Sequence, residues 1–209
     1  MSDPVMMVPP SRPRVTRAEV EALLAPFAID RLAHPLLVLG LRGYYASAEN
    51  GVNQIGIYDD AIVLVSPAAL LCCNGNTDPS KHRVGHGDGA AAKGMATLKA
   101  PQVCYAHVLG MHHPDKPTGY PALVQRAGHV TVIRDGTPPY EDTGDFGINI
   151  HRGGYNTTSS EGCQTVHPDQ WMGFWSSLVE LAKSHFGPAH WWQSAVIPYV
   201  LVDVTRGTP

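Results

Sequence analysis

Most hydrophobic positions of this chain fall into short runs that end at glycine, proline or charged residues. Apolar runs of this length, rich in β-branched residues, are typical of strands. In the run that precedes a long polar loop, Ile148 and Ile150 occupy alternate positions, so we expect both side chains on one face and His151 at the end of the strand. Strands are predicted over residues 34–45, 60–67, 102–110, 129–136, 146–154 and 195–205.

A helical pattern precedes the first of these strands. In residues 16–27, Thr16 and Glu19 have the spacing of a capping box, and Pro26 is expected to end the helix. Residues 1–14 show no periodic pattern and contain four prolines. We therefore expect an irregular N-terminal tail over 1–14, followed by a short helix.

A second, stronger helix is expected after residue 167. Pro168 suits the first position of a helix, and Gly187 followed by Pro188 would end it. One strong helix among many strands predicts an α+β fold with antiparallel strands and long loops, in a single domain over residues 15–209. The apolar positions with helical spacing are Trp171, Phe174, Trp175, Leu178, Leu181 and Ala182.

Composition and charge argue against a nucleic-acid-binding protein and against a membrane-spanning one. The chain has 209 residues, a net charge of −3 at pH 7 and no run of clustered Lys and Arg, so it lacks the basic surface that nucleic-acid binding requires. It has no apolar run of transmembrane length. Asp3 and the prolines interrupt the place where a secretory signal would be apolar. We expect a protein made in a cytoplasm, with neither a nucleic-acid partner nor a membrane span.

Four cysteines divide into two groups. Cys72, Cys73 and Cys104 lie within apolar runs, and no pair has the CxxC spacing of a zinc ribbon or a thioredoxin motif. We expect these three to pack as small hydrophobic side chains. Cys163 instead follows a glycine in a polar loop, which leaves it as the cysteine with a candidate chemical role.

The loop "HRGGYNTTSSEGCQTV" over 151–166 joins a histidine to this cysteine. A cysteine nucleophile needs a nearby base, and His151 could supply it if the loop folds back. It also needs backbone N–H groups directed at the oxyanion, which Cys163 and its neighbours could provide. Gly162 would let the chain turn sharply or approach a substrate closely. The pair Cys163 and His151 is therefore the candidate catalytic site, with Gly162 and Ser160 in the turn.

The residues "INIHRGG…SSEGCQTV" resemble the catalytic segment of the L,D-transpeptidase family. In that family a strand ends in a His, a glycine follows closely, and a polar loop leads to Ser-x-Gly-Cys. The resemblance implies a β-rich mixed-sheet catalytic domain that acts on peptidoglycan stem peptides through a Cys–His pair. It assigns His151 as the base and Cys163 as the nucleophile, with Ser160 and Gly162 in the turn.

The chain also departs from the family pattern. The spacing from His to Cys is shorter than usual. The family's second His, two residues before the Cys, is Glu161, and the Arg two residues after it is Thr165. Arg152 stands where the family has a glycine directly after the first His. A peptidoglycan enzyme of this size without an export signal resembles a bacteriophage lysis protein, an endolysin, which would remain in the host cytoplasm until release.

Three further residues are expected to contact the substrate. Arg152 could bind a carboxylate with its planar guanidinium group. Asn76 belongs to a polar segment after "LLCC", and Gln164 directly follows the candidate nucleophile. We expect all three at the edge of the site.

The sequence therefore predicts a cysteine hydrolase of peptidoglycan peptides that needs no cofactor and no metal. Three alternatives stay open. The first is a true L,D-transpeptidase, and the second is a non-catalytic phage structural or wall-binding protein. The third is a metal-dependent peptidase that uses the His-rich segments over 81–89 and 110–117, with His112, His113 and Asp115 as ligands. The absence of HExxH spacing argues against this third alternative.

Overall fold

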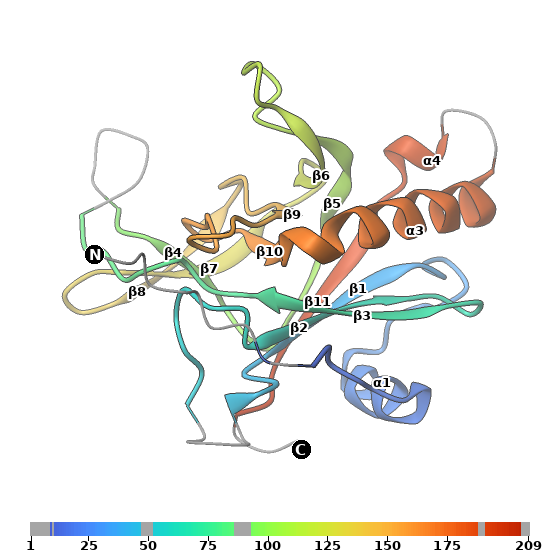
Figure 1. Cartoon of the computed structure of the whole chain (residues 1–209), viewed down its shortest axis with the longest axis horizontal. Coiled ribbons are helices and arrows are strands. Elements are labelled where there is room, and N and C mark those ends of the chain that lie inside the picture. Colours follow the sequence, from blue (N-terminus) through green and yellow to red (C-terminus); the bar gives the residue numbers. More distant parts are fainter. Residues whose placement is uncertain (1–8, 10, 47–51, 86–92, 188–190, 206–209) are drawn as a thin grey trace.

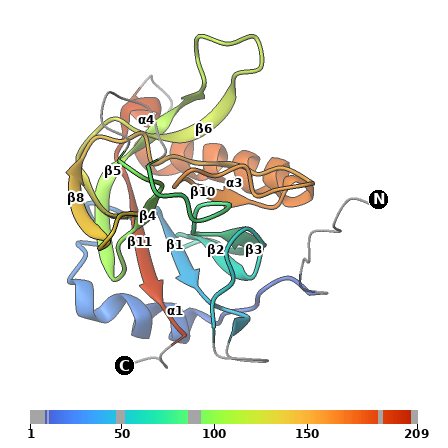
Figure 2. The same cartoon turned by 90° about the vertical axis from the view of Figure 1, so that its left-hand side faces the viewer.

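Most strands of the described residues form one closed sheet, and the others form a smaller separate sheet (Figures 1 and 2). The computed structural model describes residues 9, 11–46, 52–85, 93–187 and 191–205. In spatial order the strands of the closed sheet are β1 (Leu37–Arg42), β11 (Ile197–Asp203), β5 (Gln102–His112), β6 (Tyr120–Gln125), β9 (Ile150–Arg152), β10 (Gln164–Val166), β3 (Leu70–Asn76) and β2 (Asp60–Val65). A smaller sheet holds β4 (Ala96–Leu98), β7 (Val130–Arg134) and β8 (Tyr140–Gly144).

The closed sheet is mixed rather than antiparallel. β1 pairs with β11 in parallel, and β9 pairs with β10 in parallel, whereas the other neighbours in the closed sheet are antiparallel. The expectation of antiparallel strands from the sequence was therefore too narrow. The β-rich, mixed-sheet α+β class is what the structure has, in one sheet-dominated domain with few helices.

Two hydrophobic cores lie on opposite faces of the strands. Along β1, Val38 packs in the core that α3 (Pro168–Phe186) covers, whereas Leu37 and Leu39 pack in the core beside α1 (Arg17–Leu24). Figure 1 shows α1 and α3 on different sides of the sheet. Because successive side chains of a strand point to opposite faces, a continuous apolar run can fill both cores.

The two predicted helices are present. The capping box of Thr16 and Glu19 is complete, and α1 ends at Leu24, where a 3₁₀ turn over Ala25–Phe27 contains Pro26. α3 begins at Pro168 and is followed by a short helix, α4 (Trp191–Ser194). Within the described residues, no helix combines the length and the apolar character that crossing a membrane requires.

Several strand boundaries differ from the predictions. The segment after "LLCC" is not a polar loop, because β3 continues to Asn76. The strand expected over 146–154 is shortened to β9, because the side chain of Gln125 accepts the N–H groups of Phe146 and Ile148. The expected tail over 1–14 lies largely outside the described residues, and its described part contains no helix or strand.

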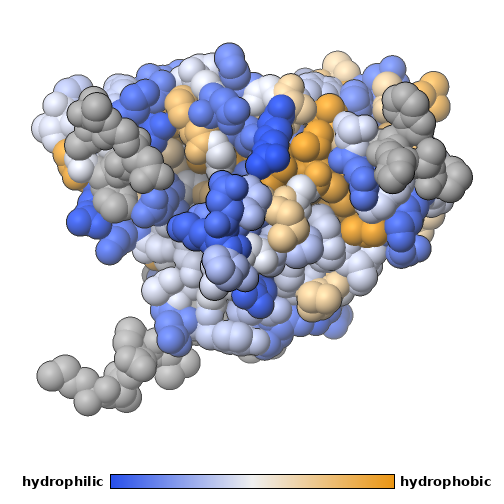
Figure 3. Space-filling view, turned by 90° about the horizontal axis from the view of Figure 1, so that it is seen from above, coloured by the Kyte–Doolittle hydropathy of each residue, from blue (hydrophilic) through white to orange (hydrophobic). Residues whose placement is uncertain are grey.

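The hairpin of β5 and β6 extends beyond the closed sheet, as both cartoon views show. Seen from above, the face that carries this hairpin has hydrophilic residues near its middle and an apolar area toward the side of α3 and α4 (Figure 3). The turn end of the hairpin (111–116), its opposite end (124–126) and the loop that leads to β10 border the same cavity. The closed sheet thus brings segments from across the chain to one site.

Candidate active site

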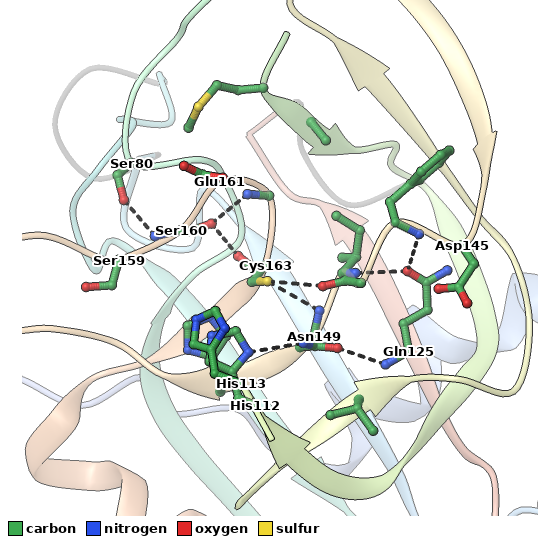
Figure 4. Close-up of a pocket in the computed structure, with 18 of the residues that line it drawn as sticks. Ser80, His112, His113, Gln125, Asp145, Asn149, Ser159, Ser160, Glu161 and Cys163 are labelled. Carbon is green, nitrogen blue, oxygen red and sulfur yellow. Dashed lines mark hydrogen bonds between the residues drawn. The ribbon is translucent and has the colours of Figure 1, made fainter. Parts of the chain in front are cut away.

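Both members of the predicted Cys–His pair line a cavity of about 1200 Å³, and Figure 4 shows Cys163 within it. Cys163 directly precedes β10, and His151 is the middle residue of β9, its parallel neighbour. Main-chain hydrogen bonds between adjacent strands therefore fix the spacing of the two segments. Cys163 is mostly buried, and His151 has 1% of its surface exposed.

The turn before Cys163 depends on a glycine and a serine. Gly162 has φ +148°, and a Cβ there would lie 2.4 Å from the carbonyl oxygen of Ala96 in β4. The close approach that the sequence suggested is thus to a neighbouring strand. Ser160 is buried; its Oγ accepts the N–H of Gly162 at 3.0 Å and donates to the carbonyl of Cys163 at 2.7 Å. Because its hydroxyl is used in this way, Ser160 braces the turn.

The thiol of Cys163 has two main-chain partners. It donates to the carbonyl of Gly147 and accepts the N–H of Asn149, each at 3.4 Å (Figure 4). Burial raises the pKa of the Cys163 thiol to about 11, and the hydrogen bond from Asn149 opposes this rise only in part. At neutral pH the group is therefore a neutral thiol. Among the described residues, the backbone N–H of Cys163 has no hydrogen-bond acceptor.

Hydrogen bonds determine the tautomer of His151. Its Nδ1 lies 2.7 Å from the carbonyl oxygen of Arg152, which can only accept, so Nδ1 carries the proton. Tyr120 Oη lies 2.9 Å from the same nitrogen and donates to the same carbonyl. The Nε2 atom is buried without a hydrogen-bond partner. His151 thus has an unprotonated ring nitrogen available to accept a proton.

A second histidine stacks on the first with the opposite tautomer. The ring centroids of His112 and His151 are 4.1 Å apart, with an interplanar angle of 15°. The N–H of Gln125 binds Asn149 Oδ1 and so orients the amide, whose Nδ2 then lies 3.1 Å from Nδ1 of His112 (Figure 4). An amide N–H₂ can only donate, so Nδ1 of His112 accepts and Nε2 carries the proton.

Both histidines are neutral at neutral pH. Burial, and after it the neighbouring His112, lowers the pKa of His151 to about 3. Burial likewise lowers the pKa of His112 to about 4, with contributions from His113 and Lys116. A resting thiolate–imidazolium pair is therefore disfavoured. Proton transfer from Cys163 becomes favourable only as the sulfur forms a bond and its charge moves to another atom.

Three residues expected to contact a substrate lie elsewhere. Asn76 is fully buried in β3 and donates to the carbonyl of Asp78. Gln164 is fully buried, with its amide between Gly162 and the hydroxyl of Tyr199. Neither lines the cavity, and their polar groups are hydrogen-bonded within the interior of the protein.

Arg152 also lies outside the lining of the cavity. Its side chain is exposed, and its guanidinium carbon sits 5.1 Å from the centroid of the Tyr120 ring. The structure therefore gives Arg152 a packing contact with Tyr120, while its carbonyl orients His151. A direct role in binding substrate has no support in this geometry.

The other cysteines are distinct from Cys163. Cys73 and Cys104 are buried in the hydrophobic core, and burial raises both thiol pKa values to about 12. Cys72 is partly buried and packs against the core beside α1. None of these three lines the cavity.

The described histidines of the segment 110–117 contact a neighbouring ring or an amide group, and they are not arranged around a common point as metal ligands would be. The His113 ring lies against His112 with the ring centroids 3.9 Å apart and the planes tilted by 50°, and Nδ1 of His112 is hydrogen-bonded to Asn149. In the described part of the chain, no three His, Cys, Asp or Glu side chains are arranged to hold a metal ion. Residues 86–89 of the other segment lie outside the described residues.

No family model, curated protein or solved structure matches this chain. The site must therefore be interpreted from its own geometry. Tyr120, Asn149 and Gln125 orient the two histidines, yet none of them was a candidate in the sequence. His112 was noted only as a possible metal ligand. The single signal for these residues was a polar side chain within an otherwise apolar strand, which occurs in many proteins for structural reasons.

Proposed function

We propose that this protein is a cysteine hydrolase that cleaves peptide bonds of peptidoglycan. The observation that carries the proposal is the shared cavity of Cys163 and His151, in which His151 Nε2 lacks a donor. The thiol and the unprotonated imidazole line one cavity without a hydrogen bond between them, because the thiol donates to Gly147. General-base activation requires the two side chains to approach each other when a substrate binds. The segment that holds the pair also resembles the catalytic segment of L,D-transpeptidases.

In the proposed reaction, Cys163 Sγ attacks the carbonyl carbon of the substrate as its proton passes to His151 Nε2. The carbonyl π electrons move to the oxygen and form a tetrahedral oxyanion. When the intermediate collapses, the C–N bond breaks and the imidazolium of His151 protonates the leaving amine. Water then attacks the thioester with His151 as base, which releases a carboxylic acid and restores the thiol.

Two hydrogen-bond donors of the site suit the oxyanion. The backbone N–H of Cys163 lacks an acceptor among the described residues. The second donor is the Nε2–H of His112, whose tautomer is fixed by Asn149. Donors already oriented toward the developing charge can contribute about 3 kcal/mol each to stabilising a transition state. Because His112 is neutral, it can donate without competing with His151 for the proton.

The proposal extends to a bacteriophage lysis enzyme, because the segment from His151 to Cys163 resembles that of enzymes that act on peptidoglycan. The nearest alternative is L,D-transpeptidation, in which an amine rather than water attacks the thioester. A wall-binding protein that retains the fold without catalysis is the alternative from another class. The three differ in their products, so one experiment can separate them.

Incubation with purified sacculi, followed by mass spectrometry of released muropeptides, tests the proposal. Hydrolysis adds water and yields shorter peptides, transfer yields new cross-links, and binding without chemistry changes no mass. The Cys163→Ala variant should lose activity by several orders of magnitude while it keeps its fold and its binding to the wall. The matched control is Cys104→Ala, which should alter stability by about 1 kcal/mol and leave turnover unchanged.

The outcome for His151→Ala completes the test. Because nucleophile and base act as a unit, its loss should be nearly as large as that of Cys163→Ala, and the double variant should be no worse than either. A Cys163→Ala protein that digests sacculi at the parental rate would disprove a cysteine mechanism. Full inhibition by EDTA with resistance to iodoacetamide would favour the metal-dependent alternative.

A further inference from the structure

The cavity carries an excess of cationic side chains in a protein whose net charge is −3. Among the described residues, the lining includes six Lys or Arg side chains and three acidic ones. The cationic residues are Lys81, Arg83, Lys93, Lys116, Arg126 and Arg134, and the acidic residues are Asp115, Asp145 and Glu161. A cleft with one sign of charge raises the local concentration of ligands of the opposite sign.

Only part of this positive charge is neutralised within the protein. Lys93 and Arg134 both lie 3.2 Å from Asp142, a carboxylate outside the cavity lining. By contrast, Lys81, Arg83, Lys116 and Arg126 are exposed and pair with no carboxylate of the described residues. These four residues are therefore free to bind an anionic ligand.

The segments that carry Lys81 and Arg126, two of the cavity-lining cations, lie on opposite sides of the candidate nucleophile. In Figure 4, Ser80 and Gln125 lie on opposite sides of Cys163. Lys81 directly follows Ser80, and Arg126 directly follows Gln125. A peptide laid across Cys163 would thus run between two segments that each contribute a cationic residue to the cavity lining.

We propose that the cavity selects peptides that carry a free carboxylate on each side of the group bound at Cys163. This inference rests on the proposed function for the position of the peptide, and it specifies the substrate as a dianionic peptide whose carboxylates are not amidated. Arg126 and Arg83 can bind a carboxylate with two parallel hydrogen bonds, whereas Lys81 and Lys116 act as point charges.

The test measures binding rather than turnover, so it does not depend on catalysis. The Cys163→Ala variant is titrated calorimetrically with four synthetic stem peptides: one with two free carboxylates, two with either carboxylate amidated, and one with both amidated. Each amidation should weaken binding about threefold, and both together about tenfold, the range expected for exposed ion pairs. The difference should shrink as salt is raised from 50 to about 300 mM, since exposed pairs are screened.

Variants that remove one positive charge each identify which cationic residue binds which carboxylate of the peptide. In the Cys163→Ala background, Lys81→Gln should abolish the effect of amidating one carboxylate, and Arg126→Gln should abolish the effect of amidating the other. The matched control is Arg14→Gln, which removes an exposed charge outside the cavity and should preserve both effects.

Equal binding of all four peptides would overturn the inference, and so would loss of sensitivity to the same carboxylate in both variants. Equally tight binding of a single-stranded oligonucleotide would also overturn it, because the charge would then select any polyanion. Charge-dependent binding without cleavage by the parental protein would uphold the inference and reject the proposed hydrolysis.

Discussion

His112 and His151 stack face to face in the cavity, 4.1 Å between ring centroids, yet their hydrogen bonds place the imidazole protons on different nitrogens. The carbonyl of Arg152 fixes the proton of His151 on Nδ1, and the amide of Asn149 leaves the proton of His112 on Nε2. One ring therefore accepts a proton while the other donates a hydrogen bond. The two imidazoles should not substitute for each other.

Two variants of His112 test this division of roles. His112→Phe keeps a flat ring against His151 but removes the N–H donor, and kcat should fall about 100-fold, as for loss of an oxyanion donor. His112→Gln restores an N–H group and should recover part of that loss. Steady-state kinetics on a soluble muropeptide would measure both, with KM expected to change little. Equal activity of the Phe variant and the parent would exclude His112 as a donor.

The pH dependence of activity should reflect neutral histidines. Because the pKa of His151 is lowered to about 3, the base stays unprotonated well below pH 6, and kcat/KM should hold a plateau from about pH 5 to 8. An unperturbed histidine would instead produce an acidic limb near 6.5. Rates on a soluble peptide between pH 4 and 9 would distinguish the two. A limb centred near 6.5 would contradict the neutral, buried His151.

Alkylation of Cys163 should be slow in the resting protein. Its thiol pKa is raised to about 11, so the thiolate fraction, and with it the rate of reaction with iodoacetamide, should rise about tenfold per pH unit from pH 7 to 10. Mass spectrometry of the modified peptide would follow this rate. A rate that is already constant at pH 6 would indicate a thiolate–imidazolium pair instead.

Buried histidines should make the fold sensitive to acid. Burial lowers the pKa of His107 to about 4, and its Nε2 lies 2.8 Å from the carbonyl of Ile148. Between pH 6.5 and 4 the unfolded chain binds a proton at this position and the folded chain does not. The free energy of unfolding should therefore fall with falling pH, by up to about 1.4 kcal/mol per pH unit for this histidine.

His107→Gln is the matched variant for this effect, because its amide can still donate to the carbonyl of Ile148. Urea unfolding at pH 7, 6 and 5 should show a smaller loss of stability in the variant than in the parent. Parallel pH profiles for the two proteins would show that His107 does not titrate in this window.

Two glycines form a natural pair for testing the turn before Cys163. Gly162→Ala places a Cβ 2.4 Å from the Ala96 carbonyl at φ +148°, so we expect a loss of about 2 kcal/mol of stability and a displaced Cys163. Gly173 lies in α3, and apart from its own helix backbone no atom lies within 4 Å of its Cβ position. Gly173→Ala should add about 0.5–1 kcal/mol through helix propensity. Thermal unfolding and activity assays of the two variants would measure this difference. Equal changes in stability and activity for Gly162→Ala and Gly173→Ala would contradict the prediction.

The sequence predicted correctly the helix ends that depend on residues close together in the chain. The capping box at Thr16 and the helix start at Pro168 depend on residues within a few positions, and both are present. β3 was not predicted because the hydrogen-bond partner of its polar end is distant in the sequence. The N–H and the side chain of Asn74 are both hydrogen-bonded to the side chain of Gln170 in α3. No pattern within residues 70–78 indicates that partner.

The candidate site shows the same limit. Cys163 and His151 could be paired because they flank one loop, and the structure brings both to the same cavity. His112 and Tyr120 come from a hairpin some thirty residues earlier, and their contacts with His151 arise only when β6 pairs with β9. Asn76 and Gln164 were expected at the edge of the site but lie in the interior, because polarity alone does not distinguish a cavity wall from a hydrogen-bonded interior.

Closure of the sheet has a consequence for the order of folding. β11 lies between β1 and β5, so the strand nearest the end of the described chain joins two strands from far earlier in the sequence. Such pairings carry a large loop-closure entropy, and proteins dominated by them fold slowly. During synthesis, β9 and β10 leave the ribosome before β11 can fill the gap. The thiol and its two histidines should therefore acquire their final geometry late, once the whole described chain has been made.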